Sequence, residues 1–102
     1  MTVFVTLGLL GERDRSLLPG VDLRPLDSKI RKTYDIPKDA FGVIVVNSVG
    51  DQNNFKEGVL IVEINGAPIR NLEDVRNNLQ KGFNRFYVWY AGKYRFVSYR
   101  IP

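Results

Sequence analysis

The stretch that decides the fold runs from Gly58 to Ile69 and reads GVLIVEINGAPI. Its first part, Val59–Ile64, is apolar and β-branched, which predicts a buried strand. The Asn65-Gly66 dipeptide that follows accepts the positive φ angles of a tight turn. We therefore expect a strand, a two-residue turn and a brief continuation through Ala67–Ile69.

The residues before this stretch predict two further strands and a helix. Phe41–Val46 is a nearly continuous apolar run, typical of a central strand that is covered on both faces. Asp27 or Ser28 can cap a helix that continues through Tyr34. Val21–Pro25 predicts a short strand, whose proline confines it to a sheet edge or to a strand end. We expect this strand to have one unpaired side.

Further upstream, the chain changes character within its first sixteen residues. Thr2–Leu10 is rich in β-branched residues and predicts another strand. Gly11–Ser16 is charged and apolar-free, which predicts a linker or an exposed loop. Because the apolar start has no basic residues and no small-residue cleavage site, it is interpreted as a strand and not as a signal peptide.

After the deciding stretch, the sequence predicts a second helix. Asn71 can cap it and Gly82 can end it. Leu72, Val75 and Leu79 form its apolar stripe, for which packing in the core is favoured over lining a groove.

The C-terminal part predicts a β-hairpin. Phe83–Tyr90 and Tyr94–Ile101 are rich in strand-forming residues and flank Ala91-Gly92-Lys93. Strands and helices thus follow one another in a mixed order that suits a small α+β domain, mostly β, with a curled sheet and helices at its open ends.

The composition bounds the function. The chain has 102 residues, 44% of them hydrophobic and 25% charged, which fits one globular domain. It has no histidine and no cysteine. These absences remove Ser/His/Asp and Cys/His catalysis, disulfides, and thiolate or imidazole metal sites, so we expect no cofactor and no metal. Binding therefore outranks catalysis.

The charge is unevenly distributed. The formal net charge is +4, and no acidic residue follows Asp74. Beyond that point lie six cations: Arg76, Lys81, Arg85, Lys93, Arg95 and Arg100. No apolar run approaches the roughly 20 residues that cross a bilayer, so a membrane is not an expected partner.

Three segments together resemble a PDZ domain of the bacterial Do-type (HtrA) serine proteases. They are Phe41–Val46, the Gly58–Ile69 strand and turn, and Leu72–Arg76 at the start of the groove helix. Gly20–Leu23 lies where such domains carry a carboxylate-binding loop. The resemblance implies a PDZ-like curled antiparallel sheet, or partial barrel, capped by two helices, with an extra N-terminal strand and linker.

The resemblance also implies a domain organisation and a location. Residues 17–102 are expected to form the C-terminal, second PDZ domain of such a protease, and residues 1–16 to be the tail strand and linker of a preceding domain. The catalytic residues would lie elsewhere in an exported, periplasmic or possibly secreted parent, whose signal peptide is outside this chain. This chain itself is expected not to be an enzyme.

PDZ domains bind extended peptides by adding a strand to an exposed sheet edge. Val21–Leu26 is the expected edge here, with Arg13 or Arg15 adding a charge-assisted contact from the preceding loop. Gly20 fits an ordinary turn as well as a binding loop. The expected peptide-binding residues are Gly20, Val21, Asp22, Leu23, Arg24, Leu26, Arg76 and Leu79.

The hairpin is the second candidate surface. It holds eight of the aromatic residues, interleaved with arginine and lysine. Such a surface suits contacts with other domains or protomers of the parent, for which the candidates are Arg85, Tyr87, Trp89 and Arg95. The alternative is binding of single-stranded nucleic acid, which also uses rings and cations. Because alternation buries about half of these rings, a protein partner is favoured.

Overall fold

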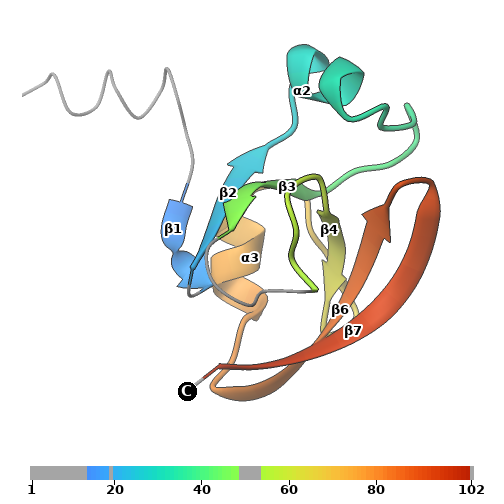
Figure 1. Cartoon of the computed structure of the whole chain (residues 1–102). Coiled ribbons are helices and arrows are strands. Elements are labelled where there is room, and N and C mark those ends of the chain that lie inside the picture. The colour runs from blue at the N-terminus through green and yellow to red at the C-terminus, as the bar shows by residue number, and fades with distance from the viewer. Residues whose placement is uncertain (1–13, 19, 49–53, 102) are drawn as a thin grey trace, which may run out of the picture.

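We describe a computed structural model of the chain, covering residues 14–18, 20–48 and 54–101. The strands share one mostly antiparallel sheet in the order β1-β2-β3-β4-β6-β7, and β5 pairs with β4 (Figure 1). The strands are β1 (Asp14–Leu18), β2 (Val21–Pro25), β3 (Val43–Ser48), β4 (Leu60–Ile64), β5 (Ala67–Pro68), β6 (Gly82–Tyr90) and β7 (Lys93–Ile101). Two helices complete the fold, α2 (Ser28–Thr33) and α3 (Leu72–Asn78). The predicted α+β, mostly β, PDZ-like class is confirmed.

The deciding stretch folds as predicted. Ile64 pairs with Ala67 across a turn in which Asn65 and Gly66 have φ angles of 52° and 86°. The strand that precedes this turn, β4, lies between β3 and β6 in the sheet. This position buries Leu60, Ile61 and Ile64 and explains the largely apolar run.

Both predicted helix caps are confirmed. The Asp27 side chain accepts a hydrogen bond from the backbone N–H of Ile30 at 2.7 Å, and the Asn71 side chain accepts one from Asp74 at 2.8 Å. The predicted end of the second helix is wrong. Helix α3 ends at Asn78 with Leu79 as its C-cap, because Leu79 has already turned to an extended conformation.

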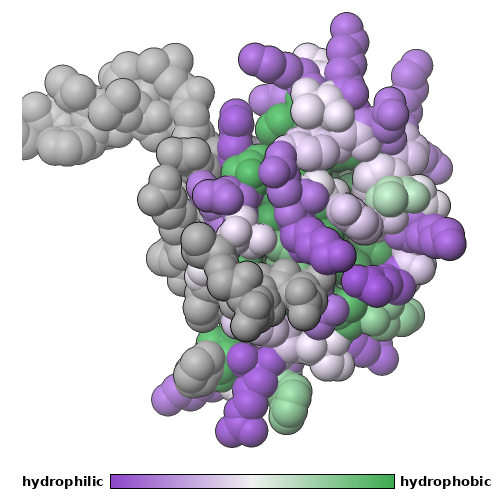
Figure 2. Space-filling model, viewed as in Figure 1, coloured by the Kyte–Doolittle hydropathy of each residue, from purple (hydrophilic) through white to green (hydrophobic). Residues whose placement is uncertain are grey.

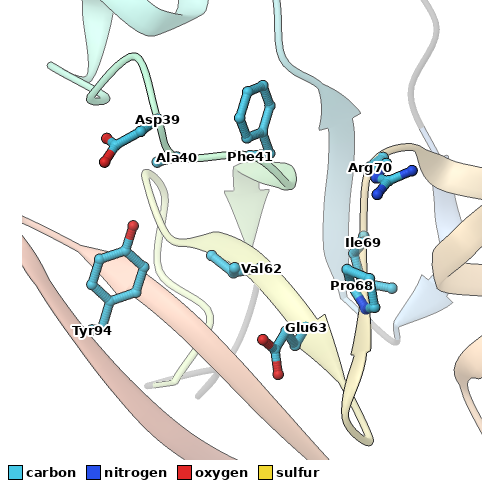
Figure 3. Close-up of a pocket in the computed structure, with 9 residues that line it drawn as sticks. All are labelled: Asp39, Ala40, Phe41, Val62, Glu63, Pro68, Ile69, Arg70 and Tyr94. Carbon is cyan, nitrogen blue, oxygen red and sulfur yellow. The ribbon is translucent and has the colours of Figure 1, made fainter.

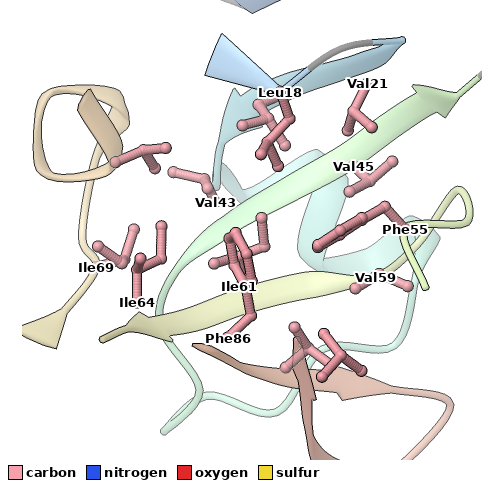
Figure 4. Packing of buried hydrophobic residues seen from close by; sticks show 14 of the residues in the cluster. Leu18, Val21, Val43, Val45, Phe55, Val59, Ile61, Ile64, Ile69 and Phe86 are labelled. Carbon is pink, nitrogen blue, oxygen red and sulfur yellow. The ribbon is translucent and has the colours of Figure 1, made fainter. Parts of the chain in front are cut away.

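The main core lies between the sheet and α3, and Figure 4 shows its side chains. Fully buried leucine, valine, isoleucine and phenylalanine residues fill it, and the α3 residues Leu72 and Val75 belong to it. The prediction that the α3 stripe packs in the core is therefore confirmed. Burying such a side chain contributes about 1.5–3 kcal/mol each, so this cluster dominates the stability of the domain.

A smaller cluster lies under α2, where Ile30, Leu60 and Trp89 are buried together. Tyr34, the C-cap of α2, joins it from the side and donates a hydrogen bond from its hydroxyl to the Glu57 carboxylate at 2.7 Å. Burial, this hydrogen bond and the negative charge of Glu57 raise the pKa of Tyr34 to about 12. The contact ties α2 to the segment that enters β4.

Three predictions about the ends of strands need comment. Phe41 was expected to begin the central strand, but β3 begins at Val43 and the Phe41 ring is exposed. The prediction that residues 11–16 form a linker or exposed loop is wrong for residues 14–16, because β1 begins at Asp14. The strand predicted at Thr2–Leu10 lies outside the described residues. No helix in the described part of the chain is long and apolar enough to cross a bilayer.

Candidate functional site

The predicted binding edge is covered. Strand β2 does not have an unpaired side, because β1 pairs with it antiparallel through Asp14↔Leu23 and Leu18↔Val21, while β3 pairs on its other side. The prediction of a free edge at Val21–Leu26 is therefore wrong for Val21–Leu23, the part that β1 covers. The strand-end alternative for the proline is correct, because Pro25 is the last residue of β2 and lies beyond the stretch that β1 covers.

Strand β1 occupies the place where the groove was expected. It lies beside β2 and contacts α3, which also contacts β2 (Figure 1). Leu18, labelled in Figure 4, is 0% exposed. It belongs to the main cluster together with Leu23 and Val75. Leu17 packs against the same cluster while remaining half-buried. The space expected between Leu23 and α3 is thus filled by the chain's own strand.

The predicted groove residues fall into two groups. Val21, Asp22 and Leu23 are buried beneath β1, and Gly20 is exposed with a φ of 72° at the turn between β1 and β2. Three other predicted residues lie outside the stretch of β2 that β1 covers. Leu26 packs against the smaller cluster and Leu79 against the main one. A guanidinium nitrogen of Arg24 lies 3.7 Å from the Asp27 carboxylate. Arg76 is exposed and forms a hydrogen-bonded ion pair of 3.0 Å with Glu73.

An asparagine network fixes α3 against the sheet, and the sequence did not reveal it. Asn84 is 1% exposed; its amide oxygen accepts hydrogen bonds from the Gln80 backbone N–H and the Asn65 side chain, both at 2.9 Å. Its amide nitrogen donates to the carbonyls of Gln80 and Gly82. The Asn65 side chain also donates to the carbonyl of Asn78, the last residue of α3. The tight turn therefore holds the end of the helix that borders β1.

The outer face of the β6–β7 hairpin carries the second candidate site. Tyr87 stacks on Tyr94 with ring centroids 5.3 Å apart and contacts Phe96 at 4.6 Å. The Arg85 guanidinium lies 4.9 Å from the Phe96 ring centroid, and that of Arg100 lies 5.6 Å from the Phe83 ring centroid. Each such contact between a cation and a ring contributes about 0.5–1 kcal/mol at an exposed site.

The four predicted interface residues do not share one surface. Arg85 and Arg95 are exposed and Tyr87 is half-buried, but Trp89 is 4% exposed and packs in the smaller cluster. Trp89 is therefore a core residue, and the prediction that it contributes an exposed ring is wrong. The even positions Phe86 and Val88 are also buried, as the alternation predicted.

An open hollow of about 450 Å³ lies between the hairpin, β4 and the segment after β5 (Figure 3). Tyr94 and Arg70 stand on opposite sides of it, and Val62 of β4 lies between them. Its lining residues are Asp39, Ala40, Phe41, Val62, Glu63, Pro68, Ile69, Arg70 and Tyr94. The lining has both acidic and basic groups, and the sequence singled out none of these residues as a site.

The fold and these surfaces define a PDZ-like domain, and no group of three or more metal-ligating side chains gathers among its described residues. No protein-family model matches the chain. A stretch of 59 residues, 55% of this chain, is 39% identical to a probable periplasmic serine endoprotease, DegP-like, of Rickettsia prowazekii (strain Madrid E). The chain spans 12% of the length of that protein. The likeness indicates a domain of the kind found in HtrA proteases.

Proposed function

We propose that this chain is a non-catalytic protein-interaction domain, the C-terminal PDZ domain of a periplasmic HtrA-type serine endoprotease. Two findings support this: the PDZ-like fold and the partial match to a DegP-like endoprotease. Because the chain has no histidine, it cannot supply a Ser/His/Asp triad by itself. Its role is to bind extended polypeptide segments, from substrates or from neighbouring protomers, and so to control assembly and access to the protease.

The observation that carries the proposal is the seating of β1. An antiparallel strand lies on β2, contacts α3 and buries a leucine in the cluster that those elements share. Strand addition by a peptide uses the same elements: backbone hydrogen bonds to β2 for affinity and an apolar pocket for selection. The chain therefore contains an internal example of the complex that we propose it forms with a partner.

A peptide can bind at β2 only by taking the place of β1. An incoming segment must displace β1, so its apparent affinity is reduced by the fraction of molecules in which β1 is undocked. Leu18 sets this fraction because it is the fully buried side chain at the C-terminal end of β1. A domain of this kind binds tightly only when β1 is withdrawn, which gives the parent a means of control.

Heteronuclear NMR of the full chain tests the proposal with a peptide that ends in apolar residues, added to the wild type and to Leu18→Ala. We expect chemical-shift changes along β2 and α3, together with loss of amide protection in β1. No binding by either chain at millimolar peptide would overturn the proposal. Shift changes confined to other elements would overturn it as well.

A further inference from the structure

The opposite edge of the sheet is formed by β7. Strand β7 has 9 residues and pairs with β6 along its whole length, from Ile101 opposite Gly82 to Lys93 opposite Tyr90. No strand in the described part of the chain pairs with its other side. An edge of this length presents a row of backbone donors and acceptors to a further strand.

The register identifies which groups face outward. A two-residue turn makes Tyr90 and Lys93 a hydrogen-bonded pair, and such pairs then recur at every second residue. The backbone groups of Lys93, Arg95 and the odd residues that follow therefore point toward β6. Those of the even residues point away from the sheet; they are Tyr94, Phe96, Ser98 and Arg100.

The two faces of this edge differ in chemistry. On the outer face, the rings of Phe96 and Tyr94 are 58% and 45% exposed, which leaves apolar ring area in water that contact with a partner would bury. On the other face, Lys93 and Arg95 border a hollow of about 370 Å³ together with Tyr90 and Ala91. Neither cation forms an ion pair with a carboxylate of the described residues.

The cations alone have a simpler explanation, because charged side chains on an edge strand discourage edge-to-edge aggregation. That explanation does not account for exposed rings on the same strand, which favour association. On the face shown in Figure 2, outside the grey atoms, hydrophilic side chains separate small apolar patches and no broad apolar surface appears. Rings that favour association and cations that repel other cations therefore lie along one edge, which indicates a surface that binds partners of opposite charge.

We propose that the free edge of β7 binds an acidic, extended polypeptide segment by strand addition, at a site separate from β2. The segment's backbone would pair with the even residues of β7. Its acidic side chains would face the hollow at Lys93 and Arg95, and its apolar side chains would cover Tyr94 and Phe96. Side chains directly opposite one another on neighbouring antiparallel strands have Cβ atoms about 5 Å apart, so these pairs would be in contact.

Other occupants fit less well. A second copy of β7 would bring its own lysine and arginines against those already there, and like charges opposite one another destabilise a sheet. Nucleic-acid bases need open ring faces on which to stack. Here Tyr87 and Tyr94 stack on each other, and Arg85 lies over Phe96, so the rings already use part of their surface within the domain and do not form an open stacking platform.

The test titrates the full chain with a peptide of about nine residues in which Glu alternates with Val, matched to the length of β7. Ser98→Pro removes one outward N–H and blocks the edge, while it leaves the charges and rings unchanged. Lys93→Glu with Arg95→Glu removes the charge complementarity. Lys32→Glu with Lys38→Glu, at two exposed lysines near α2, is the matched control for net charge.

We expect wild-type shift changes centred on β7, and binding weakened about tenfold or more by Ser98→Pro and by the β7 charge reversal. The control reversal should change the affinity only slightly, and the affinity should fall with salt. Trp89 fluorescence reports whether each variant remains folded. Equal binding by Ser98→Pro would overturn strand addition. Shift changes confined to β2 and α3 would locate the peptide in the other groove and overturn this proposal alone. Tighter binding of a single-stranded oligonucleotide, insensitive to Ser98→Pro, would overturn it in favour of nucleic acid.

Discussion

Replacing Leu18 by alanine should release the β2 edge. Leu18 is 0% exposed in the main cluster, and a buried leucine-to-alanine change costs about 2–5 kcal/mol. If β1 exchanges with peptide, this cost falls mainly on the docked state of β1. A loss of about 3 kcal/mol raises the ratio of undocked to docked molecules roughly 150-fold. The apparent peptide affinity should rise in proportion, until the undocked state becomes the major one and the gain stops.

Leu60→Ala is the matched control, because Leu60 is also 0% exposed but lies in the smaller cluster away from β1. Both variants should lose stability in urea denaturation followed by Trp89 fluorescence, but only Leu18→Ala should bind an apolar C-terminal peptide more tightly in calorimetric titration. We expect a gain of about tenfold or more. Equal affinities for wild type and Leu18→Ala, both folded, would refute the exchange of β1. An equal gain in Leu60→Ala would refute the assignment to Leu18.

Three further predictions concern stability. Gly42→Ala would place a Cβ 2.0 Å from the Ile61 carbonyl oxygen, so it should cost more than about 3 kcal/mol. Gly92→Ala is the control, because Gly92 has a φ of 86° but open space around it; this variant should lose only about 1–2 kcal/mol of stability. If thermal unfolding shows that the two variants lose the same stability, the predicted clash at Gly42 is contradicted. Asn84→Ala should cost about 2–4 kcal/mol in urea, because it leaves buried hydrogen-bonding groups unpaired; a cost below about 1 kcal/mol would contradict this. Raising the pH above 10 should progressively destabilise the wild type as far as the folded-state pKa of about 12, because folding favours neutral Tyr34; Tyr34→Phe should remove this dependence, measured by alkaline denaturation.

Much of the fold was predictable because it depends on local signals. The Asn65-Gly66 turn, the Asp27 and Asn71 caps and the hairpin each follow from the conformational preferences of a few adjacent residues. The pairing of β1 with β2 was not predictable in this way. A charged segment can form a strand when its backbone groups find a partner, and no property of that segment alone shows that the partner is its neighbour.

The sites were less predictable because they depend on residues distant in sequence. Asn84 looks like a surface residue at the start of a strand, and only the fold brings Gln80 and Asn65 to its amide. Trp89 was placed by alternation on the face with Arg85 and Tyr87, which is correct. That face is not uniformly exposed, however, because α2 and the residues after it cover the end of the hairpin where Trp89 lies. Alternation predicts the face of a strand but not what covers it.

The two ends of the sheet suggest why one domain would need two binding modes. At the β1 end, the edge is closed by a strand of the same chain that buries Leu18, so the partner proposed for β2 would compete with an intramolecular segment. At the β7 end, no strand of the described residues closes the edge and Lys93 and Arg95 lie along it, so the partner proposed there would be selected by its acidity and not by exchange. The two edges lie at opposite ends of the strand order. A segment bound at β7 would hold a substrate or protomer near the domain, and its raised effective concentration would then help a second segment to displace β1. Binding of the two peptides should accordingly be independent when they are separate and should strengthen when they are linked.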